Sequence, residues 1–283
     1  MEISTELYSL YKLGDFKYIF TLLKESGFTA YDFSMNWEGL SSNIVCSDNY
    51  IEKAKKIRNI ADEVGIKCNQ SHAPLTRERL GEFEYGEKGE ELLKRAIQIS
   101  GVLGAKICVI HQPKLHTAQE NFKFFKKFEG LARHNEIKIA LENLWNWNKE
   151  NDCAKVVACS QPNSFKEHLD LLDKDVFVGC IDIGHAEMKG LDTDAVSMIK
   201  TLGNRIGAMH LHDNDKHYDW HWMPFTMKID FEGIFRALKE VGYSGDITFE
   251  TDNYINKFPV ELVPSVLKQM VEIAKYFKKK LEE

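Results

Sequence analysis

A recurring pattern of amphipathic helix, glycine and short apolar run most constrains the fold of this chain. Glycine suits the left-handed position just past a helix end. The runs that follow are short and largely apolar, which is typical of strands buried on both faces of a parallel sheet. The clearest junctions are Ser26-Gly27-Phe28, Val64-Gly65-Ile66, Leu103-Gly104-Ala105 and Val241-Gly242-Tyr243. The early repeats lie about 40 residues apart, which fits a βα unit.

Eight such strands are predicted, with helical patterns between them and a last helix over residues 259–282. The predicted strands cover residues 2–6, 28–33, 66–71, 106–111, 137–142, 176–182, 206–212 and 246–250. Eight βα units in 283 residues predict one (β/α)8 barrel, or TIM barrel, that spans residues 1–283 as a single domain. The main competitor, a doubly wound open sheet, would usually show a Gly-rich phosphate turn after its first strand, and none is present.

Charge and hydrophobicity narrow the class of protein. The 37 basic and 43 acidic residues give a net charge of −6 without a basic stripe, which disfavours a nucleic-acid partner. The N-terminus lacks a signal-peptide pattern and no apolar run approaches transmembrane length, so we expect a cytoplasmic protein without a membrane partner. The six cysteines have no paired-motif spacing and are interpreted as reduced core thiols.

Six residues of metal-ligand type stand at the C-terminal ends of six consecutive predicted strands. They are His72, His111, Glu142, Asp182, His210 and Glu250. Barrel active sites lie on the face where the C-terminal strand ends meet, so we expect these side chains to converge. A single histidine in such a position is as often a hydrogen-bonded core or loop residue as it is a metal ligand. Several buried carboxylates are costly together, however, and a cation is the simplest compensation, so the pattern predicts a divalent-metal site.

Further candidates surround this set. Asp182 and His185 share the turn after the sixth strand. His210 and His212 alternate along the seventh strand, where side chains two residues apart share a face. Asp219 and His221 occur in the next loop, which could instead be a solvated polar excursion. The candidates for additional metal or substrate contacts are therefore His72, His111, His185, His212, Asp219 and His221.

On these residues the chain resembles the xylose-isomerase-like barrels, a group of sugar and sugar-phosphate isomerases and epimerases that also holds endonuclease IV. The most specific motifs are Glu142-Asn143, Asp182-x-Gly-His185, His210-Leu-His-Asp-Asn214, Asp219-x-His221 and Glu250. The resemblance implies one core metal, either manganese, magnesium, zinc or cobalt, bound by Glu142, Asp182, His210 and Glu250. It also implies that Glu142 and Glu250 are catalytic and transfer protons on opposite faces of a substrate whose enediolate the metal stabilises.

The first expectation is therefore a metal-dependent isomerase or epimerase acting on a sugar or sugar phosphate. Endonuclease IV holds three zinc ions, and its five further ligands match His72, His111, His185, Asp219 and His221. The alternative is thus a zinc phosphodiesterase acting on abasic DNA. The acidic net charge and the scarcity of loop arginines, with only Arg77 and Arg79 near the first loops, argue against it. A metal-bearing binding protein is a third interpretation. The sugar, the metal and the oligomeric state stay open.

Two segments depart from the pattern of the group. Ketose 3-epimerases in it usually carry an arginine shortly after the seventh-strand histidine, and residues 213–218 contain none. Many relatives have glycines after the Asp-x-His motif, and residues 221–226 lack them. These departures weaken a specific 3-epimerase assignment and indicate an atypical loop.

All five tryptophans fall in predicted loops after strands two, five and seven, on the expected active-site face. They are Trp37, Trp145, Trp147, Trp220 and Trp222. An aromatic ring can cover the apolar CH surface of a sugar, so Trp37, Trp145, Trp220 and Trp222 are predicted to stack on substrate. Loop packing, a partner interface and stacking on bases are the alternatives.

Overall fold

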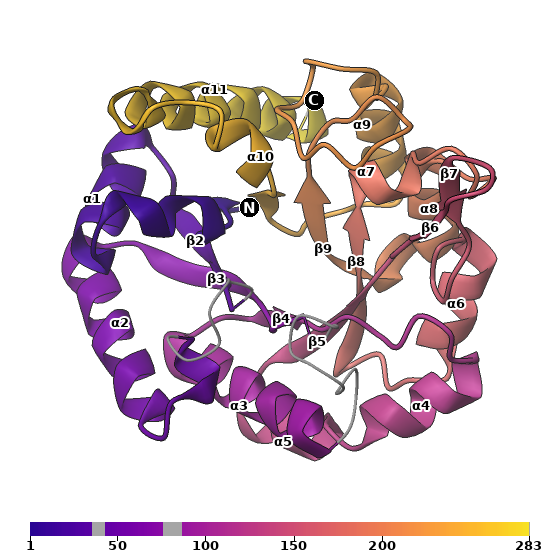
Figure 1. The fold of residues 1–283 in the computed structure, drawn as a ribbon, viewed down its shortest axis with the longest axis horizontal. Helices are drawn as coiled ribbons and strands as arrows, with labels where there is room; N and C mark the ends of the chain where they lie inside the picture. The colour runs from indigo at the N-terminus through magenta and orange to yellow at the C-terminus, as the bar shows by residue number, and fades with distance from the viewer. Residues whose placement is uncertain (36–42, 76–86, 283) are drawn as a thin grey trace.

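A ring of eight parallel strands forms the centre of the protein, and helices surround it (Figure 1). The computed structural model describes residues 1–35, 43–75 and 87–282. The ring contains β1 (Ile3–Thr5), β2 (Ala30–Ser34), β3 (Lys67–His72), β4 (Ile107–Val109), β5 (Lys138–Glu142), β8 (Phe177–Asp182), β9 (Ile206–Leu211) and β10 (Ile247–Phe249). Hydrogen-bonded neighbours follow the order β1-β10-β9-β8-β5-β4-β3-β2. The predicted (β/α)8 barrel is confirmed, and the doubly wound alternative is wrong.

Contacts between β1 and β2 close the ring. The Thr29 amide donates to the Ile3 carbonyl at 3.0 Å, and the Leu7 amide donates to the Asp32 carbonyl at 3.2 Å. Glu6 and Asp32 form an isolated parallel bridge. The first and second strands therefore meet through isolated hydrogen bonds rather than through a continuous ladder.

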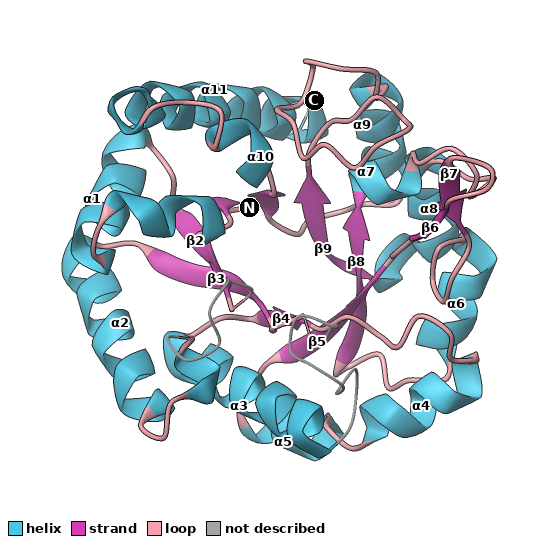
Figure 2. Cartoon of the chain, in the orientation of Figure 1, coloured by secondary structure: helices cyan, strands magenta, loops and turns pink. Residues whose placement is uncertain are grey.

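The helices form the outer layer, shown in cyan in Figure 2. The α-helices are α1 (Phe16–Ser26), α2 (Tyr50–Val64), α3 (Glu87–Leu103), α4 (Ala118–Lys126), α5 (Glu129–His134), α6 (Pro162–Asp170), α7 (Ile183–Ala186), α8 (Ala195–Leu202), α9 (Phe231–Glu240), α10 (Asp252–Ile255) and α11 (Val263–Glu282). Short 3₁₀ segments are η1 (Tyr8–Leu13), η2 (Ile44–Cys46), η4 (Gly203–Arg205) and η5 (Val260–Leu262). As the glycine pattern predicts, α1 ends at Gly27 with φ 103° and α2 ends at Gly65 with φ 77°.

The loop after β5 contains an antiparallel hairpin that the sequence analysis did not predict. Its strands are β6 (Asn146–Asn148) and β7 (Cys153–Lys155), and Trp147 pairs with Ala154. Each strand has only three residues, which is too short for an alternating pattern to be recognised.

Small side chains fill the barrel interior beneath the C-terminal strand ends. Ala140, Cys180 and Ala208 are buried in one cluster, and each lies two residues before Glu142, Asp182 and His210 respectively. Since side chains two residues apart share a face, the strands present small residues inside the barrel and ligand-type residues at its mouth. The larger apolar residues pack between the strands and the helices.

All six cysteines are free thiols, and Cys68, Cys108 and Cys180 are buried in strands as expected. Within the described residues, no helix combines the length and the hydropathy that a membrane crossing needs.

A buried acid lies at the closure of the ring. Glu6 is 4% exposed, and its carboxyl accepts bonds from the Ser9 amide at 3.1 Å and the Ser9 hydroxyl at 2.6 Å. Burial, and then the nearby Asp252, raise the pKa of Glu6 to about 8. The folded protein therefore holds Glu6 in its neutral form at neutral pH.

The raised pKa of Glu6 predicts that the protein loses stability as pH rises toward about 8. The folded-state pKa exceeds the unfolded value of about 4.3, so the stabilisation is complete below that value and is lost as pH rises through about 8. Glu6→Gln should remove a loss on the order of 2 kcal/mol between about pH 6 and about pH 9. Urea unfolding across this range measures the effect, with the exposed Glu52→Gln as the control. Identical pH profiles for wild type and Glu6→Gln would contradict it.

Candidate metal centre at the mouth of the barrel

Four side chains from adjacent strands meet at the C-terminal mouth of the barrel. Glu142 and Asp182 end β5 and β8, His210 lies in β9, and Glu250 directly follows β10. One ligand atom from each of the four lies within 4.8 Å of the others. The side chains of Glu142, Asp182 and His210 are almost fully buried, and that of Glu250 is 21% exposed. The predicted convergence of these four residues is therefore confirmed.

The chemistry of this donor set fits a divalent cation. Three carboxylates share a site with little access to water, where mutual repulsion and desolvation are costly without a counter-charge. His210 Nδ1 is buried without a hydrogen bond of normal geometry, although it lies 3.1 Å from Glu250 Oε2. One imidazole and three carboxylates suit zinc, manganese, magnesium or cobalt.

Glu142 is the acid around which the histidines gather. Its Oε2 lies 3.1 Å from His111 Nε2, 3.4 Å from His72 Nε2 and 3.6 Å from His210 Nδ1. Its Oε1 lies 3.3 Å from His185 Nδ1. Burial alone would raise the pKa of Glu142, but the charges of His111 and His210 hold that pKa well below its usual range. Glu142 is therefore an ionised carboxylate inside the protein.

His72 and His111 form a second donor group with Glu142. Their ligand atoms and that of Glu142 lie within 4.8 Å of one another. His72 Nδ1 is 2.8 Å from the Ala73 carbonyl, which can only accept, so this nitrogen carries the proton. His72 Nε2 then faces Glu142, an arrangement common among metal-binding histidines.

A third donor group has Asp219 at its centre. Its other members are His185, His212 and His221. Asp219 Oδ2 lies 3.0 Å from His185 Nε2 and 3.2 Å from His221 Nε2. The Trp145 indole also donates to this oxygen, at 3.3 Å. Burial alone would raise the pKa of Asp219, but His221 and His185 hold it well below its usual range.

His212 belongs to the third group and also contacts the core group. Its Nε2 lies 2.9 Å from Asp182 Oδ1 and 3.7 Å from Asp219 Oδ1. The His212 ring stacks on that of His221 with centroids 4.2 Å apart. All six residues singled out as additional candidates thus lie in or beside the core group.

Asn143 fixes the relation between the β5 and β8 ends. Its side-chain Nδ2 donates to the Asp182 backbone carbonyl, and its Oδ1 accepts from the Asp182 backbone N–H, both at 2.8 Å. The Asn143 carbonyl lies 2.9 Å from His185 Nδ1 and sets the tautomer of that ring. Asn143 stood in the Glu142-Asn143 motif, but its bonding role was not identified from the sequence.

A polar layer beneath His210 was also missed. Gln70 Nε2 donates to Asp32 Oδ2 at 2.8 Å and lies 2.9 Å from His210 Nε2. Both residues are buried within strands. The available signal was the polarity of Asp32 and Gln70 in runs that otherwise read as buried, with Gln70 two residues before His72 on the same face.

The aromatic loops flank the site, with different surroundings for each tryptophan. Trp147 stacks on Tyr218 with centroids 5.6 Å apart, and Trp222 meets Tyr254 edge-on at 5.2 Å. Trp220 is 37% exposed, whereas Trp145 is partly buried and bonds Asp219. Trp37 lies outside the described residues. Stacking on a substrate stays a prediction for Trp37, Trp145, Trp220 and Trp222.

Comparison with known proteins agrees with the barrel fold. A family model described as "Xylose isomerase-like TIM barrel" matches residues 20–279. The protein y4fM of Sinorhizobium fredii is 28% identical over 272 residues, covering 83% of this chain and 81% of that protein. An L-ribulose 3-epimerase of Methylomonas sp. is 26% identical over 180 residues, covering 58% of this chain and 56% of its own length. The crystal structure of a D-psicose 3-epimerase shares the fold, with a TM-score of 0.71, 12% identity and coverage of 98% and 99% of the two chains.

The close approach of Gly184 to His212 predicts a position that tolerates no side chain. A Cβ at Gly184 would lie 1.9 Å from His212 Cε1 and 2.5 Å from both ring nitrogens. Because His212 is fully buried, Gly184→Ala should cost about 1–3 kcal/mol of stability. Gly130→Ala in α5 is the matched control, since its Cβ meets nothing within 4 Å and should stabilise by about 0.4–1 kcal/mol. Chemical denaturation distinguishes the two, and equal stability of both variants would contradict the prediction.

Proposed function

This chain belongs to the xylose isomerase-like TIM barrel family, and from that premise we propose that it is a divalent-metal-dependent sugar isomerase or epimerase. The observation that carries the proposal is the buried group of Glu142, Asp182, His210 and Glu250 at the barrel mouth. Relatives and structural neighbours named as sugar 3-epimerases support a small sugar as the substrate. This set of residues is compatible with either a sugar or a sugar phosphate as the substrate. It is also compatible with either isomerisation or epimerisation as the reaction.

Glu142, Asp182, His210 and Glu250 would hold the cation. When bound there, a divalent cation supplies Lewis-acid polarisation of a substrate carbonyl and stabilises the negative charge that develops on its oxygen.

Glu142 and Glu250 are the proposed proton-transfer groups. Glu142 ends β5 and Glu250 follows β10, with β8 and β9 between them in the ring, so the two carboxylates approach the site from different sides. Burial alone would raise the pKa of Glu250, but His210 holds it well below its usual range, as it does for Glu142. Both therefore start as bases. One would remove the proton beside the carbonyl and keep it, and the other, first protonated by solvent, would deliver a proton on the opposite face, after which both reset by proton exchange with water.

The neighbouring histidines would position the substrate. His185 and His72 each hold one ring nitrogen on a backbone carbonyl, which fixes the ring and leaves the other nitrogen toward the site. Fixed ring nitrogens of this kind suit the hydroxyl groups of a sugar. Trp220, whose ring is partly exposed beside the site, is the most accessible of the described tryptophans for contact with the sugar CH surface.

The proposed proton-transfer role of the two glutamates predicts that their glutamine variants behave differently from a variant of His210. Glu142→Gln and Glu250→Gln keep the side-chain size and one oxygen ligand but remove the base. Turnover of the active ketose should therefore fall by at least about a hundredfold, with weakened metal binding retained. His210→Ala should weaken metal affinity first, so added metal should restore part of its activity.

Turnover as a function of metal concentration, together with metal content, tests this expectation for all three variants. Glu187→Gln is a control outside the donor groups. Near-normal turnover in both glutamine variants would reduce Glu142 and Glu250 to ligands and require other proton-transfer groups.

The arrangement of the remaining donors favours a second candidate function, metal-assisted phosphodiester hydrolysis. His72, His111 and Glu142 form one group, and His185, His212, Asp219 and His221 form another, both adjoining the core four. Three neighbouring donor groups match the three-zinc pattern of endonuclease IV. The net charge of −6 disfavours binding to the phosphate backbone, so we rank this candidate below the sugar reaction.

We predict that the protein does not incise abasic DNA above background at physiological salt with zinc present, because an acidic protein gains little from counterion release. An abasic-site duplex and an intact duplex of the same sequence form the matched substrates. Elemental analysis of protein purified without chelator should find about one ion per chain, as sugar chemistry at the core four requires. Metal-dependent incision together with three ions per chain would reverse the ranking.

A further inference from the structure

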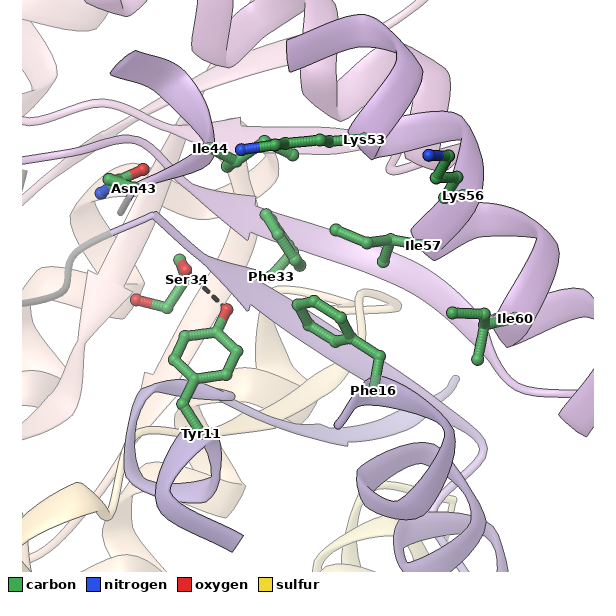
Figure 3. A pocket seen from close by; sticks show the side chains of 10 residues that line it. All are labelled: Tyr11, Phe16, Phe33, Ser34, Asn43, Ile44, Lys53, Lys56, Ile57 and Ile60. Atoms are coloured by element: carbon green, nitrogen blue, oxygen red, sulfur yellow. Dashed lines mark hydrogen bonds between the residues drawn. The ribbon is translucent and has the colours of Figure 1, made fainter. Parts of the chain in front are cut away.

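An apolar pocket lies outside the barrel, between α1, η1 and α2 and against the outer face of β2 (Figure 3). Its volume is about 240 Å³. Its lining residues are Tyr11, Phe16, Phe33, Ser34, Asn43, Ile44, Lys53, Lys56, Ile57 and Ile60. Phe33 follows Asp32 in β2, and successive side chains in a strand point to opposite faces. Asp32 contacts Gln70 beneath the metal centre, so the pocket is on the other side of the strand from that centre.

The wall of the pocket offers little polar surface to a ligand. The Tyr11 hydroxyl donates to the Ser34 carbonyl at 2.8 Å, drawn as a dashed line in Figure 3. Asn43 donates to the Met35 carbonyl at 2.7 Å and accepts from the Val45 amide at 3.1 Å. The polar groups in the wall are thus already engaged, and an aromatic surface is left where the Phe16 ring lies 6.1 Å from that of Phe33. Such a cavity favours an apolar group over ordered water.

Two lysines extend from α2 along the edge of the pocket, as Figure 3 shows. Lys53 and Lys56 are one helical turn apart, and both are exposed. In the described part of the chain neither forms an ion pair, whereas Lys17 on α1 pairs with Glu63 at 3.8 Å. No acidic side chain occurs among the lining residues. The edge of the pocket is therefore positively charged, and the charge complement of a ligand there is an anion.

We propose that this pocket binds a small amphipathic carboxylate, with its apolar body against Phe16, Phe33 and Ile57 and its carboxylate between Lys53 and Lys56. The volume of about 240 Å³ equals about eight waters at about 30 Å³ each, which suits a medium-chain alkanoate or an arylalkanoate. A diacyl lipid would not fit. The proposal is independent of the metal centre, because none of the lining residues belongs to the donor groups.

Isothermal titration of the whole protein with octanoate and with 1-octanol as the uncharged match tests the proposal. Octanoate should bind one site with a dissociation constant of about 0.1–1 mM. Lys53→Gln/Lys56→Gln should weaken octanoate binding about fivefold to tenfold and leave 1-octanol binding unchanged. Lys55→Gln, an exposed lysine of the same helix that does not line the pocket, is the control and should bind octanoate as the wild type does.

Ile60→Trp tests the location, because a larger side chain from the pocket wall should occupy the cavity and abolish binding of both probes. Thermal unfolding of each variant verifies that it folds. Loss of octanoate affinity only in the double lysine variant and in Ile60→Trp supports the proposal. Absence of saturable octanoate binding to wild type would overturn it, as would equal losses in Lys55→Gln. A concentration-dependent dimer that Ile60→Trp disrupts, without octanoate binding, would assign the pocket to a second copy of the chain and also overturn it.

Discussion

The site depends on one constraint, the burial of the Glu142 carboxylate at the end of β5. An ionised carboxylate that is 1% exposed must be surrounded by positive charge or hydrogen-bond donors. His72, His111, His185 and His210 meet that requirement from β3, the β4 end, the turn after β8, and β9. Because Glu142 belongs both to the core four and to the group with His72 and His111, a change at Glu142 alters both groups.

Around this acid, the barrel interior and the loops at the mouth carry different kinds of side chain. The interior beneath the mouth includes a buried cluster with the small side chains of Ala140, Cys180 and Ala208. The loops at the mouth carry the larger aromatic residues, such as Trp147 stacked on Tyr218. Rigid strands thus position the charged groups, while longer connections carry the aromatic surface around them.

Most of the fold and of the donor set could be predicted from the sequence, because both follow from short-range regularities. Glycine after a helix marks the start of β3, and the apolar run Ile139-Ala140-Leu141 marks β5. The ends of these strands then place His72 and Glu142 on one face. The predicted last helix began too early: Val260–Leu262 is a 3₁₀ segment, and α11 starts at Val263. Helix starts are weakly encoded, since several residues there lack intrahelical bonds.

The bonds that orient the donor side chains could not be predicted, because they join residues that are distant in sequence. Asn143 bonds Asp182 across 39 residues, and Gln70 approaches His210 across 140. Such contacts depend on strand register, which a single sequence does not reveal where the runs are buried on both faces. The hairpin of β6 and β7 was missed for a different reason, namely its short strands.

The closure of the ring has a consequence for how the chain folds. β1 is at the N-terminus, and its partner β10 spans Ile247–Phe249, so the buried Ser4–Thr248 hydroxyl pair joins residues 244 positions apart. During synthesis β1 has only the few bonds to the β2 segment until the last strand emerges. The barrel can therefore close only after the chain has been made as far as Phe249, and loop-closure entropy makes this pairing slow. Glu250 follows β10 directly, so the acid that completes the core four is added by the same late step.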